Sequence, residues 1–471
     1  MITENLINSF QKICGNENVY HTTAAKLAYS YDATANFQSM PDLVISPRNT
    51  EEVISIVRLC KKHTIPIVPR GSGTNLAAGT APTSGGIVIL FKNMNQILEL
   101  DEENMTITVQ PGIITNSLIN FVEKKDLFYP PDPSSKKIST IGGNISENSG
   151  GLRGLKYGVT KDYVLGLEAV LPNGETIKTG GKLAKDVAGY DLTKLLVGSE
   201  GTLAIITEAT LKLLPKPEYQ ETILAMYHSM EDAAETVSAI LASRIIPTTL
   251  EFIDRGTLRI IEGYKKIGLP TDCEAVLLIE QDGTNETVRK DMAVIYNICN
   301  KYNAFEVQKA ETKESAEDLR TARRDALSAL AKVRPTTILE DATVPRSRVA
   351  PMVREIIHIA EKYEVLIRTF GHAGDGNLHP TCLTDIRDQK EMERVEKALE
   401  DIFNAAIKLG GTITGEHGVG EMKAPFLEWK IGKNGIAVMK AIKTAIDPDN
   451  IMNPGKIFAK STKKRVVVNN V

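Results

Sequence analysis

The sequence predicts an α+β fold divided into two or three domains, and three features of the chain support this expectation. Its 471 residues are too many for a single hydrophobic core. From Pro41 onward, short apolar runs bounded by Gly, Pro and Asn alternate with helical patterns, which is typical of strands joined by helices. Pro215-Lys216-Pro217 then separates this part from longer amphipathic segments, which indicates a domain boundary.

The first part of the chain is predicted to alternate between helix and strand. Residues 1–40 are expected to be helical, because Leu6, Ile7 and Phe10 fall on one helical face. After the strand Leu43-Val44-Ile45, a helix is expected to open at Thr50, with acidic residues in its first turn. Further strands are expected at 65–69, 86–91, 106–110 and 164–171.

The second part is predicted to combine longer helices with short strands. Amphipathic helices are expected around 231–243, 311–332 and 387–409, and a strand at 275–280. The stretch 447–456 is rich in turn residues. It is expected to cross back to the first domain rather than to form a third one.

Composition disfavours several classes of function. The formal net charge of −3 does not provide the basic surface that phosphate neutralisation requires, so no nucleic-acid partner is expected. No apolar stretch is long enough to span a bilayer, and the N-terminus lacks a secretory pattern. The five cysteines are scattered without a CxxC pair, which disfavours an iron–sulfur or zinc framework and fits a cytoplasmic location.

Glycine clusters in the first part predict a cradle for a large polar ligand. Arg70-Gly71-Ser72-Gly73-Thr74-Asn75 follows an expected strand, and its backbone N–H groups and hydroxyls suit a pyrophosphate. It is not a Rossmann fingerprint, because Leu76 stands where the third glycine would fall, and it is not a P-loop. Taken alone, the segment is explained better by an ordinary glycine turn. Further glycine clusters at 130–159 and 198–203 favour the ligand over a merely loop-rich scaffold.

Two histidine motifs in the second part predict a metal site. His372 and His379 flank an Asp-Gly turn, so a hairpin would make them cross-strand neighbours about 5 Å apart at Cβ. A second glycine-flanked motif supplies Glu416 and His417. Two imidazoles and a carboxylate form a three-ligand site with open positions, as catalytic metals need. The alternative is that these are buried structural histidines bonded to backbone, which would suit a lone histidine better.

These segments resemble the FAD-binding oxidoreductases of the vanillyl-alcohol oxidase and cresol methylhydroxylase superfamily, in its glycolate oxidase and D-lactate dehydrogenase branch. That branch carries RGxGT, PPDPSS, TIGGNIAENSGG, LKYGVT, GSEGTL, GHxGDGNLH and GEHG in this order, and each recurs here nearly verbatim. The resemblance implies a two-part FAD-binding domain of the cresol methylhydroxylase type and an α+β substrate (cap) domain. The expected parts are an N-terminal helical segment (1–40), the FAD-binding domain (41–216), the substrate domain (217–415) and a segment returning to the FAD-binding domain (416–471).

The resemblance also implies which residues hold FAD. Backbone amides of 70–75 would bind the pyrophosphate, and the other glycine clusters would line the adenosine, ribitol and flavin portions. No His or Cys lies between residues 70 and 159, where covalent attachment would occur, so non-covalent FAD is expected. Asn453 belongs to a closing NPGK element for which a structural role is equally open. The expected cofactor residues are Arg70, Gly71, Ser72, Gly73, Thr74, Asn75, Pro131, Asp132, Ser135, Gly142, Gly143, Asn144, Ser146, Gly150, Gly151, Tyr157, Gly158, Val159, Glu200, Gly201, Ile206 and Asn453.

By the same resemblance, His372, His379 and Glu416 would bind one divalent metal (Zn, Mn or Fe). His417 would act as general base and Asn377 would contact the substrate.

Arg323 matches the arginine that grips the substrate carboxylate. Because Arg320 stands where the family often has Trp, the register between Arg323 and Arg324 is open. Without the resemblance, a basic helix face would explain these arginines as well.

The implied function is FAD-dependent oxidation of a small 2-hydroxy acid, D-lactate to pyruvate. Hydride transfer to the flavin is expected, and a carbanion route stays open. Glycolate and D-2-hydroxyglutarate are the alternative substrates, and a non-catalytic flavin-binding scaffold subunit is the alternative of another class. Resemblance to the lactate dehydrogenase subunit of electron-bifurcating complexes implies an electron-transfer flavoprotein as the partner that accepts the electrons.

Overall fold

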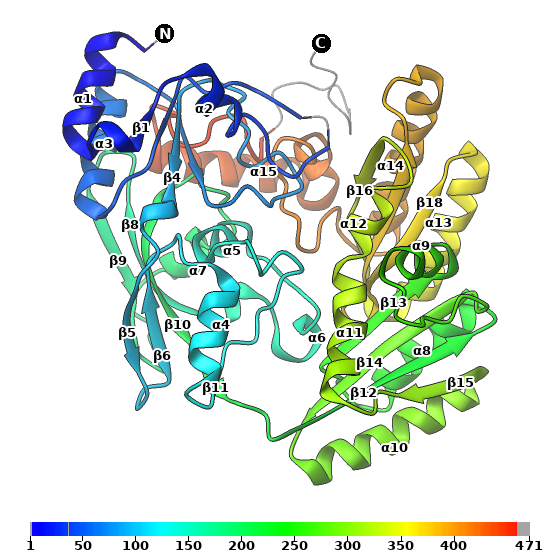
Figure 1. Ribbon diagram of the computed structural model, residues 1–471. Coiled ribbons are helices and arrows are strands. Elements are labelled where there is room, and N and C mark those ends of the chain that lie inside the picture. Colours follow the sequence, from blue (N-terminus) through cyan, green and yellow to red (C-terminus); the bar gives the residue numbers. More distant parts are fainter. Residues whose placement is uncertain (1, 36, 459–471) are drawn as a thin grey trace. The chain divides into compact units, whose positions relative to one another are not determined.

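The computed structural model describes residues 2–35 and 37–458, which form two compact units (Figure 1). Unit 1 contains 1–149, 159–215 and 416–471, and unit 2 contains 150–158 and 216–415. Both units mix helices with sheets, which confirms the expected α+β class. The division differs from the expected boundaries in two places, because residues 1–40 belong to unit 1 and residues 150–158 belong to unit 2.

A four-stranded sheet in unit 1 carries the first glycine loop. Its order is β1 (Val19–Tyr20), β2 (Leu43–Ile45), β4 (Ile87–Leu90) and β3 (Ile67–Arg70), with β2, β4 and β3 parallel. Continuous apolar runs build these parallel strands because both of their faces are buried. Helices α1 (Glu4–Cys14) and α3 (Thr50–Lys62) contribute to the core beneath the sheet.

The expectation that residues 1–40 are helical is only partly right. Helices α1 and α2 (Thr23–Leu27) form, but β1 lies between them and pairs antiparallel with β2. Val19 and Tyr20 are of the β-branched and aromatic types that favour strands, and the exposed edge of β2 offers them a partner. The local helical periodicity of the first turns gives no sign of this pairing.

A second sheet of unit 1 is antiparallel. Its order is β5 (Ile97–Asp101), β6 (Thr106–Val109), β10 (Ile205–Lys212), β8 (Val164–Val170) and β9 (Thr176–Gly180). A short pair, β7 (Leu127–Phe128) and β11 (Leu214–Pro215), accompanies it. The helices of this part are α4 (Thr115–Glu123), α5 (Ile141–Glu147) and α7 (Leu192–Leu196).

The chain returns to unit 1 after unit 2, as the turn-rich C-terminal stretch predicts. Helix α15 (Leu427–Ile446) is followed by a parallel bridge between Met452 and Ile67 of β3. Ile67 N donates to Ile451 O at 2.7 Å, and Asn453 N donates to Ile67 O at 2.7 Å. The returning segment therefore extends the edge of the parallel sheet.

Unit 2 is built on an eight-stranded antiparallel sheet. Burial of every residue from Ala275 to Asp282 shows that both faces of its strand β14 are covered. The order is β15 (Ala304–Lys309), β12 (Tyr219–Tyr227), β14 (Ala275–Gly283), β13 (Thr249–Asp254), β18 (Ile367–His372), β19 (Asn377–Thr384) and β16 (Thr336–Leu339), and β17 (Ala342–Thr343) also pairs with β19.

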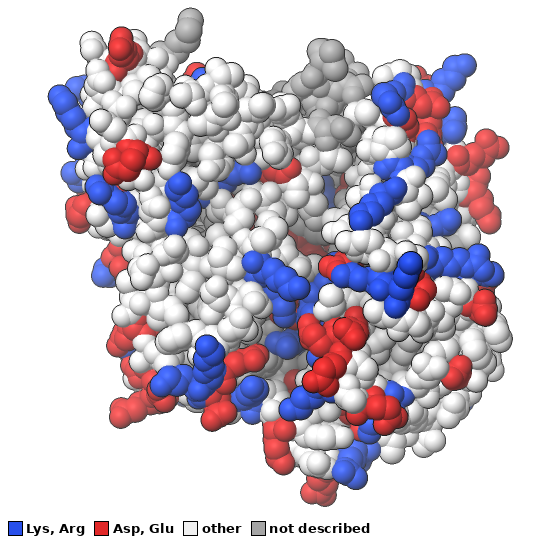
Figure 2. All heavy atoms as spheres, in the orientation of Figure 1, with Lys and Arg blue, Asp and Glu red and all other residues white. Residues whose placement is uncertain are grey.

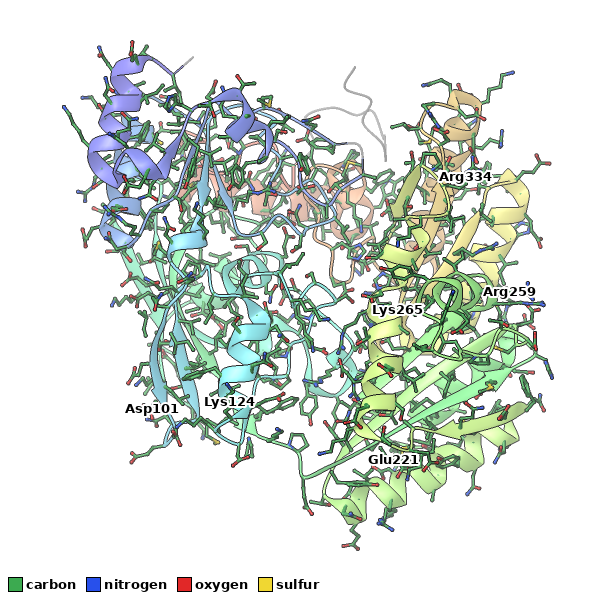
Figure 3. The ribbon with its side chains drawn as sticks, viewed as in Figure 1. Asp101, Lys124, Glu221, Arg259, Lys265 and Arg334 are labelled. Atoms are coloured by element: carbon green, nitrogen blue, oxygen red, sulfur yellow. The ribbon has the colours of Figure 1, made fainter. Side chains whose placement is uncertain are left out.

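One face of this sheet packs against α9 (Arg255–Lys265), α11 (Lys313–Arg324) and α12 (Ala326–Leu330). The helix expected at 311–332 is therefore two helices, broken at Asp325. Lys265, labelled in Figure 3, lies at the end of α9. It forms an ion pair with Asp325 at this break. The other helices of unit 2 are α6 (Gly154–Tyr157), α8 (Met230–Ala242), α10 (Asn285–Lys301), α13 (Val349–Tyr363) and α14 (Gln389–Lys408).

Some properties concern the chain as a whole. Within residues 2–35 and 37–458, none of the helices combines the length and the apolar character needed to cross a bilayer. All five cysteines lie in the described part, where each is buried and carries a free thiol. The face in Figure 2 shows basic and acidic side chains interspersed rather than one continuous basic patch.

Candidate active site

The glycine loop after β3 lines a pocket in unit 1 with a volume of about 510 Å³. Gly71 and Ser72 of the expected cofactor residues line it. Sequence reasoning missed the rest of the lining, because all of these residues except Thr140, which begins the TIGGN motif, come from segments between β4 and α5 that carry no glycine motif. They are Lys92, Asn95, Gln96, Ile97, Gly112, Ile113, Ile114, Ser117 and Thr140.

The backbone of this pocket is too closely packed for side chains at its glycines. A Cβ on Gly71 would overlap the hydroxyl of Thr140, and one on Gly112 would overlap the carbonyl of Phe91. Thr140 also caps α5, since its hydroxyl accepts from Gly143 N at 3.2 Å. Close backbone, exposed N–H groups and hydroxyls suit a pyrophosphate-containing ligand, so this part of unit 1 fits the FAD that the glycine motifs predict.

Arg70 lies beneath the loop rather than at its tip. Its side chain is buried, and its Nη1 donates to the Thr80 hydroxyl at 3.2 Å. Burial lowers the pKa of Arg70, although the nearby charge of Asp32 acts in the opposite direction. Gly73 has a φ of 69°, and a Cβ there would overlap the Arg70 guanidinium. Gly73 therefore leaves room for an arginine that supports the loop.

Glu200 holds the backbone that follows the second histidine motif. Its two carboxylate oxygens accept from Val419 N at 2.7 Å and Gly420 N at 2.6 Å. Burial raises the pKa of this carboxyl, against the effect of these two hydrogen bonds. Asn453 Nδ2 donates to the carbonyl of Glu200 at 2.7 Å. Within the described residues, Glu200 and Asn453 thus anchor the chain beyond His417.

Four expected cofactor residues are not brought to the unit 1 pocket. Gly150, Gly151, Tyr157 and Gly158 belong to unit 2. The Tyr157 hydroxyl donates to Asp282 Oδ1 at 2.9 Å, and Asp282 is on β14. The motif is continuous in sequence, but the chain changes units within it, which the glycine pattern does not reveal.

The remaining expected residues lie in unit 1 without lining this pocket. Asn144 and Ser146 are on α5, where Asn144 Nδ2 donates to the Thr115 hydroxyl at 2.8 Å and Ser146 O accepts from Glu200 N at 2.9 Å. Asp132 is buried, with its carboxylate 3.8 Å from Lys136 Nζ. The others are Thr74, Asn75, Pro131, Ser135, Gly142, Gly143, Val159, Gly201 and Ile206.

The first histidine motif forms the expected hairpin in unit 2. Strand β18 ends at His372, a short turn follows, and β19 begins at Asn377. Gly376 has a φ of 78° in this turn, a conformation that favours glycine. The register pairs His372 with Asn377 and His379 with Phe370. The two histidines are therefore diagonal neighbours on one face, not directly opposite as the sequence suggested.

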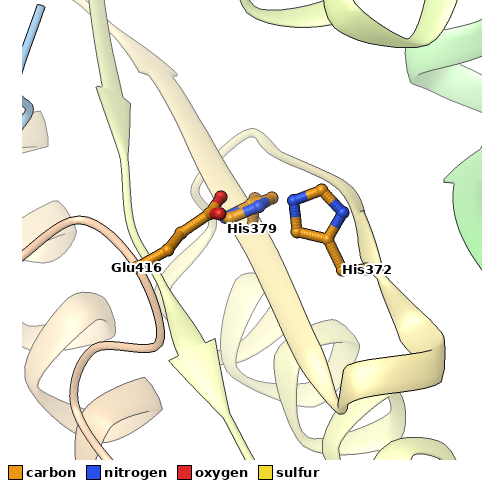
Figure 4. Close-up of side chains that lie close together, drawn as sticks. All are labelled: His372, His379 and Glu416. Carbon is orange, nitrogen blue, oxygen red and sulfur yellow. The ribbon is translucent and has the colours of Figure 1, made fainter. Parts of the chain in front are cut away.

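His372, His379 and Glu416 come together (Figure 4). One ligand atom from each lies within 4.8 Å of the other two, and both histidine rings are buried. The ring centroids of the histidines are 5.3 Å apart. Glu416 directly follows Gly415, and Asp341 Oδ2 fixes this end of unit 2 by accepting from Gly415 N and from the Thr414 hydroxyl, both at 2.8 Å.

Glu251 on β13 is the main site residue that sequence reasoning missed. Its Oε1 lies 2.6 Å from His372 Nδ1, and its Oε2 accepts from Arg323 Nε at 2.6 Å. Burial alone would raise the pKa of Glu251, but the charge of Arg323 and the hydrogen bond with His372 bring it below its ordinary value. The side chain is thus a carboxylate. A charged residue inside the apolar strand Thr249–Asp254 was the available signal.

The nearby arginines differ in what they contact. Arg323 is almost fully buried, its guanidinium carbon is 4.7 Å from the centroid of the Phe370 ring, and its Nη2 has no hydrogen-bond partner among the described residues. Arg324 bonds instead to Glu317 at 3.1 Å, earlier on α11. Arg323 is therefore linked to His372 through Glu251.

Asn377 and His417 complete the expected catalytic set. Asn377 is buried opposite His372, and its Oδ1 has no hydrogen-bond partner within the described part of the chain. A Cβ on Gly415 would lie 2.7 Å from Asn377 Nδ2, so the second motif packs closely here. His417 is 9% exposed and follows Glu416 directly.

The side chains grouped around the hairpin suit a metal ion and a carboxylate. Two imidazoles with one carboxylate are a donor set for Zn, Mn or Fe with positions left for a substrate. With Nδ1 of His372 donating to Glu251, the neutral ring presents Nε2 as a ligand. Arg323 adds an unpartnered donor on the same face of the sheet, as far as the described residues show.

Comparison with known families identifies the class of protein. Residues 41–180 match the family "FAD binding domain", and residues 216–457 match "FAD linked oxidases, C-terminal domain". The chain belongs to the FAD-linked oxidase family, and it is an FAD-linked oxidoreductase.

Among curated relatives, the chain is 66% identical to "Glycolate oxidase subunit GlcD" of Bacillus subtilis, over 99% of both chains. It is 34% identical to the Escherichia coli protein of the same name, over 93% of this chain and 88% of the relative. Identity is also 34% to "D-lactate dehydrogenase" of Anaerostipes hadrus, over 98% of both chains.

A solved p-cresol methylhydroxylase is similar in fold, with a TM-score of 0.79 and 18% identity over 97% of this chain and 98% of that one. This likeness confirms the expected cresol methylhydroxylase type of fold.

Proposed function

We propose that this protein oxidises a small 2-hydroxy acid, with FAD as the primary electron acceptor. The observation that carries the proposal is the group of His372, His379 and Glu416 with Arg323 linked to it through Glu251. A 2-hydroxy acid presents a hydroxyl and a carboxylate on adjacent carbons, which suit a metal ion and an arginine respectively.

Glycolate is the substrate that the relatives favour, because the Bacillus subtilis relative at 66% identity is named as a glycolate oxidase subunit. The D-lactate that the sequence suggested is the second candidate. The full-length match to the Anaerostipes hadrus D-lactate dehydrogenase supports it. The two acids differ by one methyl group, so the size of the pocket beside the substrate carbon decides between them.

The residues have separate tasks in this proposal. His372, His379 and Glu416 would hold a divalent ion, and such an ion would supply Lewis-acid chemistry that lowers the pKa of a hydroxyl bound to it. Arg323 binds the substrate carboxylate and Asn377 orients the hydroxyl. His417 accepts the hydroxyl proton, since a neutral imidazole is an effective base near pH 7. The bound flavin supplies a two-electron acceptor for the substrate carbon.

A protein partner is the proposed destination of the electrons. The Bacillus subtilis relative is named as a subunit, and an Arabidopsis thaliana relative is named "D-lactate dehydrogenase [cytochrome], mitochondrial". Both names fit an acceptor outside the chain. The electron-transfer flavoprotein implied by the resemblance stays a prediction, and so does a cytoplasmic location.

The test is anaerobic addition of glycolate, D-lactate, L-lactate or D-2-hydroxyglutarate to the FAD-loaded protein while the flavin absorbance is followed. We expect glycolate or D-lactate to bleach the flavin rapidly. His417→Asn should slow bleaching by about 10²- to 10⁴-fold, the usual contribution of a general base, while FAD content is unchanged. Unchanged bleaching in this variant would remove His417 from the mechanism, and no bleaching by any of the acids in the parent protein would contradict the function.

A further inference from the structure

Glu251 connects two groups that the proposed function treats separately. One of its oxygens lies 2.6 Å from Nδ1 of His372, and the other lies 2.6 Å from Nε of Arg323. The carboxylate is completely buried on β13, between β14 and β18. A buried carboxylate is stable only when its oxygens are bonded, so Glu251 depends on both partners as much as they depend on it.

The contact with His372 bears on metal binding. An imidazole that donates its Nδ1 proton to a carboxylate is fixed in one tautomer and in one ring orientation, and its Nε2 becomes a stronger ligand. The other histidine has a weaker counterpart, because His379 Nδ1 lies 3.4 Å from the carbonyl oxygen of Glu340. His372 is therefore held by a charged group, the Glu251 carboxylate.

The contact with Arg323 bears on substrate binding. Glu251 engages only the Nε edge of the guanidinium, while the Phe370 ring packs against its face. Nη2 is left without a partner among the described residues. A buried guanidinium nitrogen without a partner is costly unless a ligand supplies one, and a substrate carboxylate would do so.

We propose that Glu251 is a positioning residue which fixes His372 for the metal with one oxygen and Arg323 for the substrate carboxylate with the other. This inference rests on the proposed function of the same site. It implies that the loss of one carboxylate weakens metal binding and substrate binding together.

The chain provides a matched control in Glu280 on β14. Glu280 is also buried on the same face of the sheet, and it forms an ion pair with Arg320, one turn before Arg323 on α11. It also accepts a hydrogen bond from the Thr222 hydroxyl at 2.8 Å, so its partners are an arginine and a threonine rather than a histidine. Glu280→Gln therefore removes a carboxylate–arginine pair from the same helix and leaves the metal ligands untouched.

The experiment measures the affinity of the FAD-loaded full chain for Zn²⁺ by competition with a chromophoric chelator, and the KM of the substrate with an artificial acceptor. We expect Glu251→Gln to weaken Zn²⁺ binding by about 10- to 100-fold, as for other carboxylates behind a ligating histidine, and to raise KM as well. Glu280→Gln should leave the Zn²⁺ affinity within about threefold of the parent, the scatter of one such measurement.

Arg323→Gln separates the two roles, since it should raise KM without weakening Zn²⁺ binding. If Glu251→Gln folds poorly because it strands the buried arginine, Glu251→Gln combined with Arg323→Gln leaves no unpaired charge. This pair should bind Zn²⁺ about 10- to 100-fold more weakly than Arg323→Gln alone. Equal affinities in that comparison would overturn the inference while leaving the metal centre intact, whereas a parent protein that binds no divalent metal would overturn the metal centre itself.

Discussion

A few contacts hold the Arg323 side chain at the site. This side chain is 2% exposed, bonded to Glu251 and stacked on Phe370, whereas Arg324, whose side chain is 7% exposed, bonds to Glu317. Adjacent arginines on one helix thus have different environments, because consecutive helical positions point about 100° apart.

From this difference between the two arginines, we predict that Arg323 contributes to substrate binding and Arg324 does not. Arg323→Lys keeps the charge but loses the planar fork, so the side chain cannot bond Glu251 and a substrate carboxylate at once. We expect KM to rise by about 10- to 100-fold, equivalent to about 1.4 to 2.7 kcal/mol, with FAD content unchanged. Arg324→Lys is the matched control, because this side chain is also little exposed but bonds to Glu317 instead of Glu251, and it should change KM by less than about twofold. A larger effect of Arg324→Lys than of Arg323→Lys would reverse the register.

The residues whose grouping in space could be predicted are those that lie close together along the chain. His372 and His379 are seven positions apart around an Asp-Gly turn, so their grouping follows from local geometry. Glu251 precedes His372 by 121 residues. Only the pairing of β13 with β18 brings them together, and strand order is not encoded in any local pattern.

At the scale of elements, the glycine loop and the residue that caps α5 meet in the lining of the unit 1 pocket. Thr140 contributes to both, because it lines the pocket and caps α5. Gly71 approaches the same hydroxyl so closely that no Cβ fits between them. Because Gly71 has no side chain, the glycine loop can lie directly against the residue that caps α5.

Gly71→Ala should consequently displace Thr140 and distort the pocket. We expect the variant to retain less than about a tenth of the parent affinity for FAD, a loss of about 1.4 kcal/mol or more, measured by fluorescence titration of flavin into the stripped protein. Gly263→Ala is the control, since Gly263 is inside α9 with open space around it. That change should leave FAD affinity unchanged and stabilise the helix by up to about 1 kcal/mol. Full FAD affinity in Gly71→Ala would show that this pocket does not hold the cofactor.

The positions of strands could be predicted from the sequence more accurately than the break within a helix. The strands expected at 106–110 and 164–171 match β6 and β8 within one or two residues, because their apolar runs end at turn residues. The break between α11 and α12 at Asp325 was missed, since no Gly or Pro marks it. Tertiary contacts decide it, including the ion pair between Asp325 and Lys265 on α9.

At the scale of the whole molecule, unit 1 carries two acidic residues, Glu147 and Glu200, whose carboxyl pKa values are both raised. Glu147 at the end of α5 is half-buried, but its Oε2 is shielded from solvent and has no hydrogen-bond partner among the described residues. Burial, and then the charges of Glu200 and Asp32, raise the pKa of Glu147 well above its ordinary value. Folded unit 1 therefore binds a proton at this position more tightly than the unfolded chain does.

A carboxyl group whose pKa is raised by folding stabilises the folded state at acidic pH, where the group is protonated. It does not do so at neutral pH. Its contribution is complete below the ordinary pKa and is lost as the pH rises through the interval up to the folded pKa. Glu147→Gln removes the ionisable group at nearly constant shape. We expect it to raise the free energy of unfolding of the flavin-free protein by about 1 to 3 kcal/mol at pH 7, and by much less at pH 4.

Urea unfolding at the two pH values measures this difference. Glu103, exposed in the turn between β5 and β6, gives the control Glu103→Gln, which should change the unfolding free energy by less than about 0.5 kcal/mol. An effect of Glu147→Gln that is equal at both pH values would contradict a proton-linked origin.

The division into two units was only partly visible in the sequence. The prolines near 215 and the glycines near 415 lie at crossings between the units, but the excursion of residues 150–158 into unit 2 is not marked by any change in composition. A short segment can change units without a linker when its contacts, such as Tyr157 with Asp282, are with distant strands. Such contacts become visible only in three dimensions.

The bridge between Ile67 and Met452 has a consequence for how the protein is made. A ribosome completes residues 216–415 before it synthesises the segment that extends the edge of β3. Domains that emerge early from the ribosome fold early, so unit 2 can reach its native state during translation. Unit 1 cannot complete its parallel sheet until the returning C-terminal segment has been synthesised. Cofactor uptake is therefore a late event in biogenesis, and a nascent chain stalled before residue 451 should remain colourless.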